Sequence, residues 1–156
     1  MPHADLLAAL KPLVDVIATL APTDDAKAVL EERFALDSDA MQTLRQLVRA
    51  GIEDGSLCDR EAGGVRFSRV QKAGGDDELS IDAVHMSSPG PGHTHPNGEF
   101  DLCFAVDGAP TFDGNPEGWT VYGPGSWHVP TVEGGVMDIL YFLPGGAIRF
   151  EDNPNG

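Results

Sequence analysis

The sequence predicts a mainly β protein that begins with a helical segment. Apolar residues recur every three or four positions up to about residue 56, and at every second position from about residue 64. The chain has 156 residues, a length that favours one domain. We therefore expect about three helices within residues 1–56 and a small antiparallel barrel or sandwich within residues 64–152.

The helical segment carries its own start and stop signals. Thr23 and Ser38 are expected to cap the second and third helices, because a hydroxyl oxygen can accept a hydrogen bond from a free backbone amide. Gly55 is expected to end the third helix. Pro12 should kink the first helix or shift its start, since proline has no amide hydrogen to donate.

The second region is a series of short strands separated by clusters of Gly, Pro, Asn and Asp. The segments with alternating apolar residues are VRFSRVQ, LSIDAVHMS, EFDLCFAV, WTVY, VMDILYFL and AIRFE. Within EFDLCFAV, Glu99, Asp101 and Cys103 share one face of the strand, and Phe100 and Leu102 lie on the other. This apolar face must be covered by the helices or by a second subunit, and we expect a homodimer.

Composition excludes several classes of partner. Ten basic and 25 acidic residues give a net charge of −15, which disfavours binding to nucleic acids or anionic membranes. An anionic substrate would need local positive charge from a metal or an arginine. The apolar start of the chain lacks a basic leader and is interrupted by charges, so we expect no signal peptide or membrane span. Cys58 and Cys103 form no framework pattern, which favours reduced thiols in the cytoplasm.

The densest group of candidate metal ligands lies in GPGHTHPNGEF, residues 90–100. His93 and His95 are two residues apart, so in a strand their imidazoles point to one face. Glu99 has the same parity, and His128, at the end of GPGSWH, can supply a fourth ligand. The alternative is that these histidines only bond to loop backbone. Three imidazoles and one carboxylate instead predict an open site for a divalent transition metal (Fe, Mn, Ni, Co or Zn), whereas closed structural zinc sites usually contain thiolates.

These two segments resemble the two cupin motifs: His-x-His followed by Glu, and later Pro-x-Gly-x-x-His. The matching residues are His93, His95, Glu99, Gly125 and His128. The chain departs from the motifs at Gly123, where Pro is usual, at Val132, where Asn is frequent, and at Gly108, which comes late. These departures affect turns and leave the ligands intact. The resemblance covers the β region and implies a cupin-type barrel, that is, a double-stranded β-helix or jelly roll.

The whole chain is similar to the 4-hydroxylaminobenzoate lyase family. The shared features are the short helical N-terminus and the strings HTHPNGEFDLCFAVDG, GWTVYGPGSWHVPTVEGG and ILYFLPGGAI. The resemblance implies a metal-dependent carbon–nitrogen lyase that converts 4-hydroxylaminobenzoate to 3,4-dihydroxybenzoate and releases ammonia, in nitroaromatic breakdown. Two alternatives are an Fe(II)-dependent cupin dioxygenase acting on a small aromatic or thiol substrate, and a cupin that binds a small ligand without catalysis.

Asp101 is the candidate catalytic residue. It lies on the same face as Glu99, about 7 Å further along the strand. It could act as a general base or accept a hydrogen bond from a ligand histidine. If the parity of the strand is inverted, Asp101 is instead an ordinary surface aspartate.

Three further residues are candidates for substrate binding. Tyr122 and Trp127 lie close to His128 in the sequence and could form walls for an aromatic substrate, or they could be core aromatics. Arg149 is the candidate for the substrate carboxylate, with Arg66 and Arg69 as alternatives. A guanidinium suits this role because it can bind a carboxylate through two parallel hydrogen bonds. An ordinary surface ion pair is the alternative for each arginine.

Overall fold

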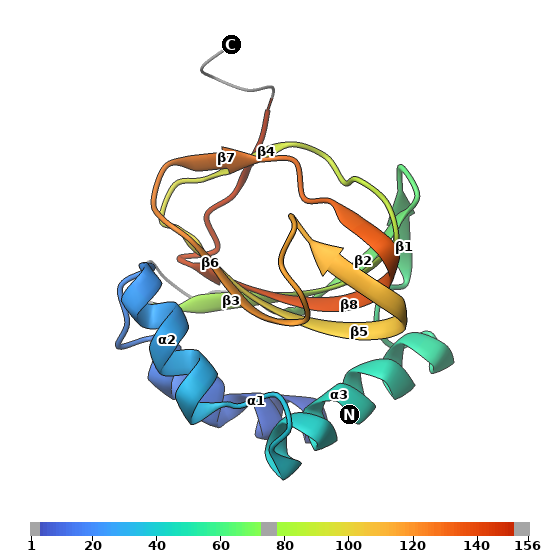
Figure 1. Ribbon diagram of the computed structural model, residues 1–156, viewed down its shortest axis with the longest axis horizontal. Coiled ribbons are helices and arrows are strands. Elements are labelled where there is room, and N and C mark those ends of the chain that lie inside the picture. Colours follow the sequence, from blue (N-terminus) through green and yellow to red (C-terminus); the bar gives the residue numbers. More distant parts are fainter. Residues whose placement is uncertain (1–3, 73–77, 152–156) are drawn as a thin grey trace.

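A computed structural model describes residues 4–72 and 78–151 of the chain. Residues 1–3, 73–77 and 152–156 lie outside the described residues; they include the start of the predicted helical segment and the last residue of the predicted β region. Three helices, α1 (Ala4–Ile17), α2 (Asp24–Arg33) and α3 (Asp39–Asp54), lie together on one side of the β-strands (Figure 1). Within the described ranges, no helix is both long and apolar enough to cross a membrane.

The helix caps have the predicted form. Thr23 and Ser38 each accept a hydrogen bond at 3.3 Å from the backbone amide three residues further on. Gly55 ends α3 in the left-handed conformation, with φ of 82°, which glycine adopts without steric cost. Pro12 does not shorten α1, which runs through it. The reason is packing, because the apolar residues on both sides of Pro12 are buried in the core.

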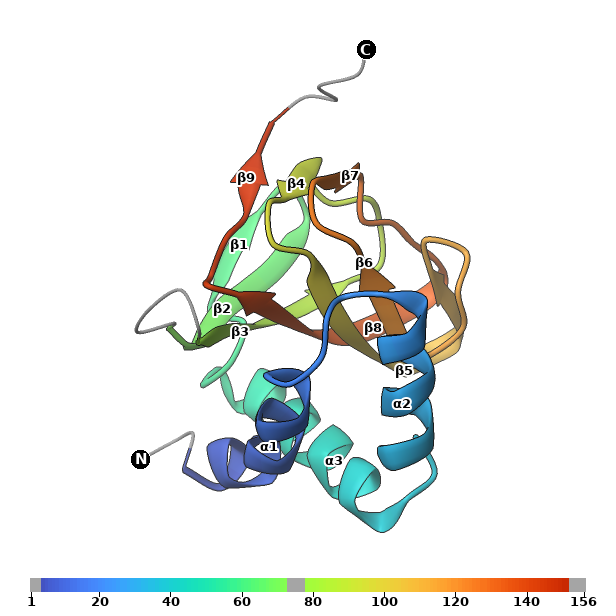
Figure 2. The same cartoon turned by 90° about the vertical axis from the view of Figure 1, so that its left-hand side faces the viewer.

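The strands form two antiparallel sheets that face each other (Figure 2). The larger sheet has the order β1-β2-β3-β8-β5-β6 and the smaller has the order β7-β4-β9. Strand β1 begins before the predicted residue 64, because its three residues form a hairpin with the start of β2. The strands are β1 (Arg60–Ala62), β2 (Val65–Gln71), β3 (Leu79–Met86), β4 (His93–His95), β5 (Glu99–Phe112), β6 (Gly118–Tyr122), β7 (Ser126–His128), β8 (Val132–Pro144) and β9 (Arg149–Phe150).

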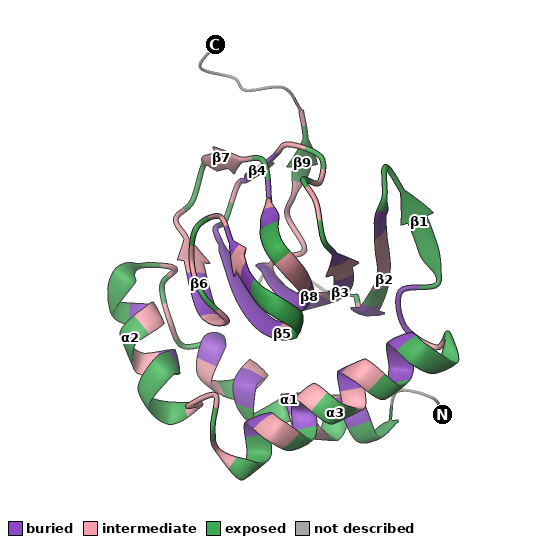
Figure 3. Ribbon diagram, turned by 45° about the vertical axis from the view of Figure 1, so that its right-hand side comes forward, coloured by how far each residue is buried: buried purple, intermediate pink, exposed green. Residues whose placement is uncertain are grey.

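Alternating residues of β5 belong to two different apolar clusters. Phe100, Leu102 and Phe104 pack with the buried residues of the three helices, whereas Cys103 belongs to a second cluster on the opposite face of the sheet. The helices turn their buried sides toward the sheet and their exposed sides away from it (Figure 3). The predicted apolar face is therefore covered by the helical segment of the same chain. It gives no support for the homodimer, which stays a prediction.

Two arginines of α3 form polar contacts with residues of the large sheet and its loops. The guanidinium of Arg45 donates to the carbonyl oxygen of Ala105 at 2.9 Å and to the carboxylate of Glu117 at 3.0 Å. The guanidinium of Arg49 lies 3.5 Å from the carboxylate of Asp138. These half-buried ion pairs fix the direction of α3 across the sheet, in addition to the apolar contacts.

Both cysteines are free and buried, in agreement with the predicted reduced thiols. Burial, the largest cause, raises the pKa of the Cys58 thiol to about 12, and the nearby carboxylate of Asp138 acts in the same direction. Burial likewise raises the pKa of Cys103 well above its usual value. Both side chains therefore remain neutral packing groups, because the reactive form of cysteine is the thiolate.

Candidate metal centre

Strands β4, β5 and β7 bring the four predicted ligands together. In the small sheet, His93 lies opposite His128, and His95 follows two residues after His93 on the same face. Glu99 is the first residue of β5. One possible ligand atom from each of these four residues lies within 4.8 Å of all the others. The site is thus assembled from three short stretches of chain.

A tight turn at Gly98 carries the chain from His95 to Glu99. The amide of Gly98 donates to the carbonyl oxygen of His95 at 3.2 Å, and its φ is 85°. A Cβ atom at this position would lie 2.5 Å from the ring of Pro22 and 2.8 Å from the carbonyl oxygen of Tyr122. Glycine is therefore required here, both for the backbone conformation and for the close approach of its neighbours.

The distances between the ligand atoms suit one shared cation. The two Nε2 atoms of His93 and His128 are 3.2 Å apart, and Nε2 of His95 is 2.9 Å from Oε2 of Glu99. The two remaining distances to Glu99 oxygens are 3.6 Å from His128 and 3.8 Å from His93. Ligands at about 2.0–2.1 Å from an ion such as zinc lie roughly 3 Å from one another, so these spacings fit.

Hydrogen bonds fix the tautomers of His93 and His128. The Nδ1 atom of His93 lies 3.1 Å from the carbonyl oxygen of Pro91, which can only accept. The Nδ1 atom of His128 lies 2.5 Å from the carboxylate of Asp113. Both Nδ1 atoms must therefore carry hydrogen, which leaves the lone pairs on the Nε2 atoms that face each other.

The third histidine is held in the same way. The hydroxyl of Ser126 donates to the carbonyl oxygen of Gly123 at 2.7 Å, so its oxygen can only accept from Nδ1 of His95, at 3.0 Å. The Nε2 atom of His95 is thereby left with its lone pair. All three imidazoles point an acceptor nitrogen at the carboxylate of Glu99.

This concentration of acceptors fits a divalent metal ion. Nε2 of His95 and both carboxylate oxygens of Glu99 are buried and have no hydrogen-bond partner among the described residues. Burial raises the pKa of Glu99, but N–H donors and positive charge on the surrounding imidazoles lower it well below its usual value when no metal ion is bound, so a cation at this place stabilises Glu99 as a carboxylate. Four facing acceptors repel one another unless a cation lies between them. The donor set, three nitrogens and one carboxylate, is one that first-row transition metals accept.

Asp113 is a residue of the site that sequence reasoning missed. One carboxylate oxygen accepts hydrogen bonds from His128 and from the Tyr122 hydroxyl, and the other accepts from the amide of Thr131 at 2.8 Å. Burial disfavours the charged imidazole of His128, but the hydrogen bonds to Asp113 and Glu99 raise the pKa of this ring to about 9 when no metal ion competes for Nε2. Asp113 has φ of 51° in the turn between β5 and β6. Its Asp-Gly dipeptide signals only a turn, because the sequence does not show that this turn reaches His128.

The structure places Asp101 on the inner face of β5, as the strand parity predicted. Its side chain is fully buried, and neither oxygen has a hydrogen-bond partner among the described residues. Burial is the main cause that raises the pKa of Asp101 well above its usual value, and repulsion from Glu99 adds to it. Asp101 is therefore a buried carboxyl group beside a metal ligand, whereas its catalytic role stays a prediction.

The predicted substrate-binding residues lie in three different surroundings. Tyr122 packs on the ligand histidines, with ring centroids 5.4 Å from His95 and 4.2 Å from His128. Trp127 lies on the face opposite the ligands, where its Nε1 donates to the carbonyl oxygen of Glu151 at 2.9 Å. Arg149 is exposed, with its Nε 3.9 Å from the Glu151 carboxylate. Of these three, only Tyr122 touches the ligand cluster.

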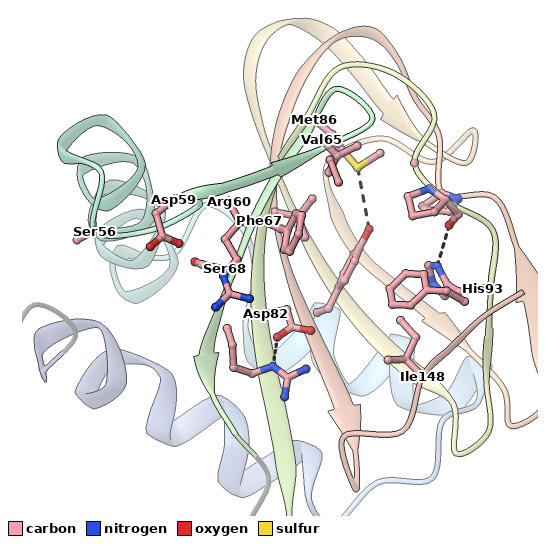
Figure 4. Close-up of a pocket in the computed structure, with 18 residues that line it drawn as sticks. Ser56, Asp59, Arg60, Val65, Phe67, Ser68, Asp82, Met86, His93 and Ile148 are labelled. Carbon is pink, nitrogen blue, oxygen red and sulfur yellow. Dashed lines mark hydrogen bonds and ion pairs between the residues drawn. The ribbon is translucent and has the colours of Figure 1, made fainter.

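A cavity of about 720 Å³ meets the ligand cluster at His93 (Figure 4). It extends from there between β2, β3 and the segment that leads into β9, toward β1 and the end of α3. Of the four ligands, His93 lines this cavity. Its volume lies within the range of roughly 300–1,000 Å³ that is typical of small-molecule sites.

Comparison with known proteins identifies both the family and the fold of the chain. A family model described as PnbB, 4-hydroxylaminobenzoate lyase, matches residues 8–150. Two relatives of that name, from Nocardioides sp. (strain LMS-CY) and Pseudomonas putida, are each 30% identical, over 96% and 81% of this chain and 95% and 83% of their own. The DMSP lyase DddQ from Ruegeria pomeroyi DSS-3 is similar in structure, with a TM-score of 0.51 and 18% identity over 97% of this chain and 98% of its own. The predicted fold class, a mainly β cupin-type fold with an N-terminal helical segment, is confirmed.

Proposed function

Because the chain belongs to the 4-hydroxylaminobenzoate lyase family, we propose that it is a metal-dependent lyase converting 4-hydroxylaminobenzoate to 3,4-dihydroxybenzoate and ammonia. The observation that carries the metal dependence is the convergence of three imidazole nitrogens on one buried carboxylate, whose two oxygens, like Nε2 of His95, have no hydrogen-bond partner among the described residues. His93, His95, Glu99 and His128 would hold the ion. When bound, it would supply a Lewis acid toward the N–O group of the hydroxylamine.

The proposed reaction needs no external oxidant. The N–O bond breaks and its oxygen leaves as water, while a second water adds to the ring carbon beside the nitrogen. Hydrolysis of the resulting imine tautomer consumes a further water and releases ammonia. The sum is one substrate and one water giving 3,4-dihydroxybenzoate and ammonia, with nitrogen reduced as the ring is oxidised.

Asp101 is the residue we propose to move protons in these steps. Its carboxyl group is buried beside Glu99 and has no hydrogen-bond partner among the described residues, so both oxygens remain available. It could give a proton to the departing oxygen and take one from the attacking water. Tyr122, packed on His95 and His128, would shield this side of the ligand cluster from water.

Anaerobic turnover tests the proposal directly. Purified protein is supplied with 4-hydroxylaminobenzoate under nitrogen, and ammonia and 3,4-dihydroxybenzoate are measured together with bound metal. We expect equal amounts of the two products, and loss of both after a chelator removes the metal. A metal-loaded protein that makes no ammonia would contradict the lyase. Turnover that requires oxygen would instead favour a dioxygenase. Full activity without metal would exclude both the metal-dependent lyase and the Fe(II)-dependent dioxygenase.

A further inference from the structure

We propose that the cavity at His93 binds the aromatic acid substrate and that Arg60 holds its carboxylate. The identity of the substrate rests on the proposed function. Arg60 lies on β1, before the β region expected from the sequence, and belongs to neither cupin motif. The proposal follows from the shape of the cavity, the pairing of its charged residues and its contact with a metal ligand.

The walls of the cavity suit a benzene ring. Figure 4 shows Val65, Phe67 and Met86 on one side, and His93 with Ile148 across from them. The ring of His93 is also in contact with the aromatic lining, with centroids 5.6 Å from Phe150 and 6.5 Å from Tyr141. An aromatic substrate would replace water against these apolar surfaces and gain stability from their burial. The apolar lining residues are Val65, Phe67, Val84, Met86, Tyr141, Ile148 and Phe150.

Arg60 is the cation of the cavity that remains free to bind an anion. Four residues with fully charged side chains line the cavity: Asp59, Arg60, Arg69 and Asp82. Arg69 donates to the carboxylate of Asp82, so these two charges compensate each other. Arg60 makes no ion pair or side-chain hydrogen bond with another described residue, Asp59 included. Its five N–H donors are therefore available to a carboxylate.

The position of Arg60 matches the shape of the proposed substrate. Strand β1 places Arg60 opposite Phe67, on the side of the cavity away from His93 (Figure 4). A para-disubstituted benzoate carries its carboxylate and its nitrogen at opposite ends of the ring. With the carboxylate at Arg60, the reacting nitrogen points toward His93 and the ligand cluster. In a chain with a net charge of −15, such a local cation is also needed to attract an anion.

The other candidate arginines have different surroundings. Arg66 alternates with Val65 and Phe67 on β2, and it does not line the cavity. Arg149 lies between Ile148 and Phe150, which both line the cavity, but its own side chain is 3.9 Å from the Glu151 carboxylate and does not line the cavity, whereas Arg60, which is also exposed, does. Arg66 is therefore a matched control for Arg60, on the same hairpin and with the same charge. Arg149 is the direct rival for the carboxylate.

The test measures binding without turnover. Calorimetry of the full-length, metal-loaded protein compares 4-aminobenzoate with 4-aminobenzamide, its neutral analogue. We expect Arg60→Ala to weaken 4-aminobenzoate binding about 10-fold or more, and Arg60→Lys to weaken it less. Arg66→Ala should leave the affinity unchanged, and binding of 4-aminobenzamide should be the same in Arg60→Ala as in the native protein. In turnover, Arg60→Ala should raise KM with little change in kcat.

The outcomes separate this inference from the proposed function. Native affinity in Arg60→Ala, an equal loss in Arg66→Ala, a loss in Arg149→Ala alone, or no binding of 4-aminobenzoate to the native protein would each overturn the Arg60 site. If binding depends on Arg60 but no ammonia forms from 4-hydroxylaminobenzoate, the site stands and the lyase proposal fails. If ammonia forms with an unchanged KM in Arg60→Ala, the site fails and the lyase proposal stands.

Discussion

The two faces of strand β5 lie in contrasting environments, although they are built from alternating residues of one segment. Phe100, Leu102 and Phe104 face the helices and form an apolar core with them. Glu99 and Asp101 face the interior between the sheets, where they are fully buried without hydrogen-bond partners among the described residues. One face is packed with apolar side chains, whereas the other keeps ionisable carboxyl groups in a buried place that disfavours their charged form.

This contrast indicates how the fold supports a reactive centre. The helix side supplies buried apolar area and the ion pairs of Arg45 and Arg49, so the sheet is held from one side. The interior can then hold carboxylates and imidazoles in close approach. Substitutions on the two faces should consequently affect different measurements, one the free energy of unfolding and the other metal content and turnover.

The largest effect is expected for His95→Ala, on the interior face. The substitution removes an imidazole whose Nε2 faces Glu99 at 2.9 Å, so metal affinity and turnover should fall by more than about 100-fold. Elemental analysis and the ammonia assay measure both. His85→Ala is the control, since His85 bonds to Asp138 outside the cluster, and it should keep its metal. Retention of metal and activity by His95→Ala would contradict the assigned ligand set.

Leu102→Ala tests the opposite face. Leu102 is fully buried against the helices, and its truncation should lower the free energy of unfolding by about 2–5 kcal/mol. Urea denaturation measures this change. The folded fraction should still bind one equivalent of metal per chain, because no ligand is altered. Loss of metal with unchanged unfolding would show that the two faces are not separable in this way.

The same contrast shows what could be predicted from sequence. Strand parity placed Glu99 and Asp101 on one face and Phe100 and Leu102 on the other, because side chains alternate at every residue of a strand. Parity applied to β7 also separates Trp127 from His128, which argues against the expected contact of Trp127 with substrate. What local patterns could not supply are contacts between distant segments.

Asp113 and Arg60 illustrate that limit. Asp113 is 15 residues from His128 in the sequence, and only the pairing of the strands shows that its turn meets this ligand. Arg60 lies on a strand of three exposed residues, too short and too polar for an alternation pattern to appear. Both residues gain their roles from tertiary contacts, which the spacing of residues along the chain does not encode.

Asp113→Asn should have an intermediate effect on the interior face. The amide keeps the size of the side chain but removes the charge that holds the Nδ1 hydrogen of His128. Metal affinity should fall by about 10- to 100-fold, with all four ligands still present. Competition with a chelator of known affinity measures this. Tyr122→Phe, which removes only the other hydrogen bond to the same carboxylate oxygen, should cause a smaller loss. Equal affinity in Asp113→Asn and the native protein would exclude a positioning role.

Asp101→Asn should have the smallest effect on stability, and in the opposite direction. The native carboxyl group is buried next to Glu99 without a hydrogen-bond partner among the described residues. Asparagine has nearly the same size, cannot ionise at any pH, and can donate a hydrogen bond toward Glu99. The free energy of unfolding of the metal-free protein should rise by about 1 kcal/mol, whereas turnover should fall because the group proposed to move protons is lost.

Ser80→Ala is the matched control for Asp101→Asn. Ser80 is opposite Leu143 in the sheet, and its buried hydroxyl oxygen likewise has no partner among the described residues. Its removal should also raise stability slightly, but with unchanged turnover, because Ser80 is neither a ligand nor the group proposed to move protons. If Asp101→Asn lowers stability, Asp101 is a structural residue with a bonding role in the fold. If both variants gain stability and only Asp101→Asn loses turnover, the interior face keeps an unfavourable carboxyl group because the reaction requires it.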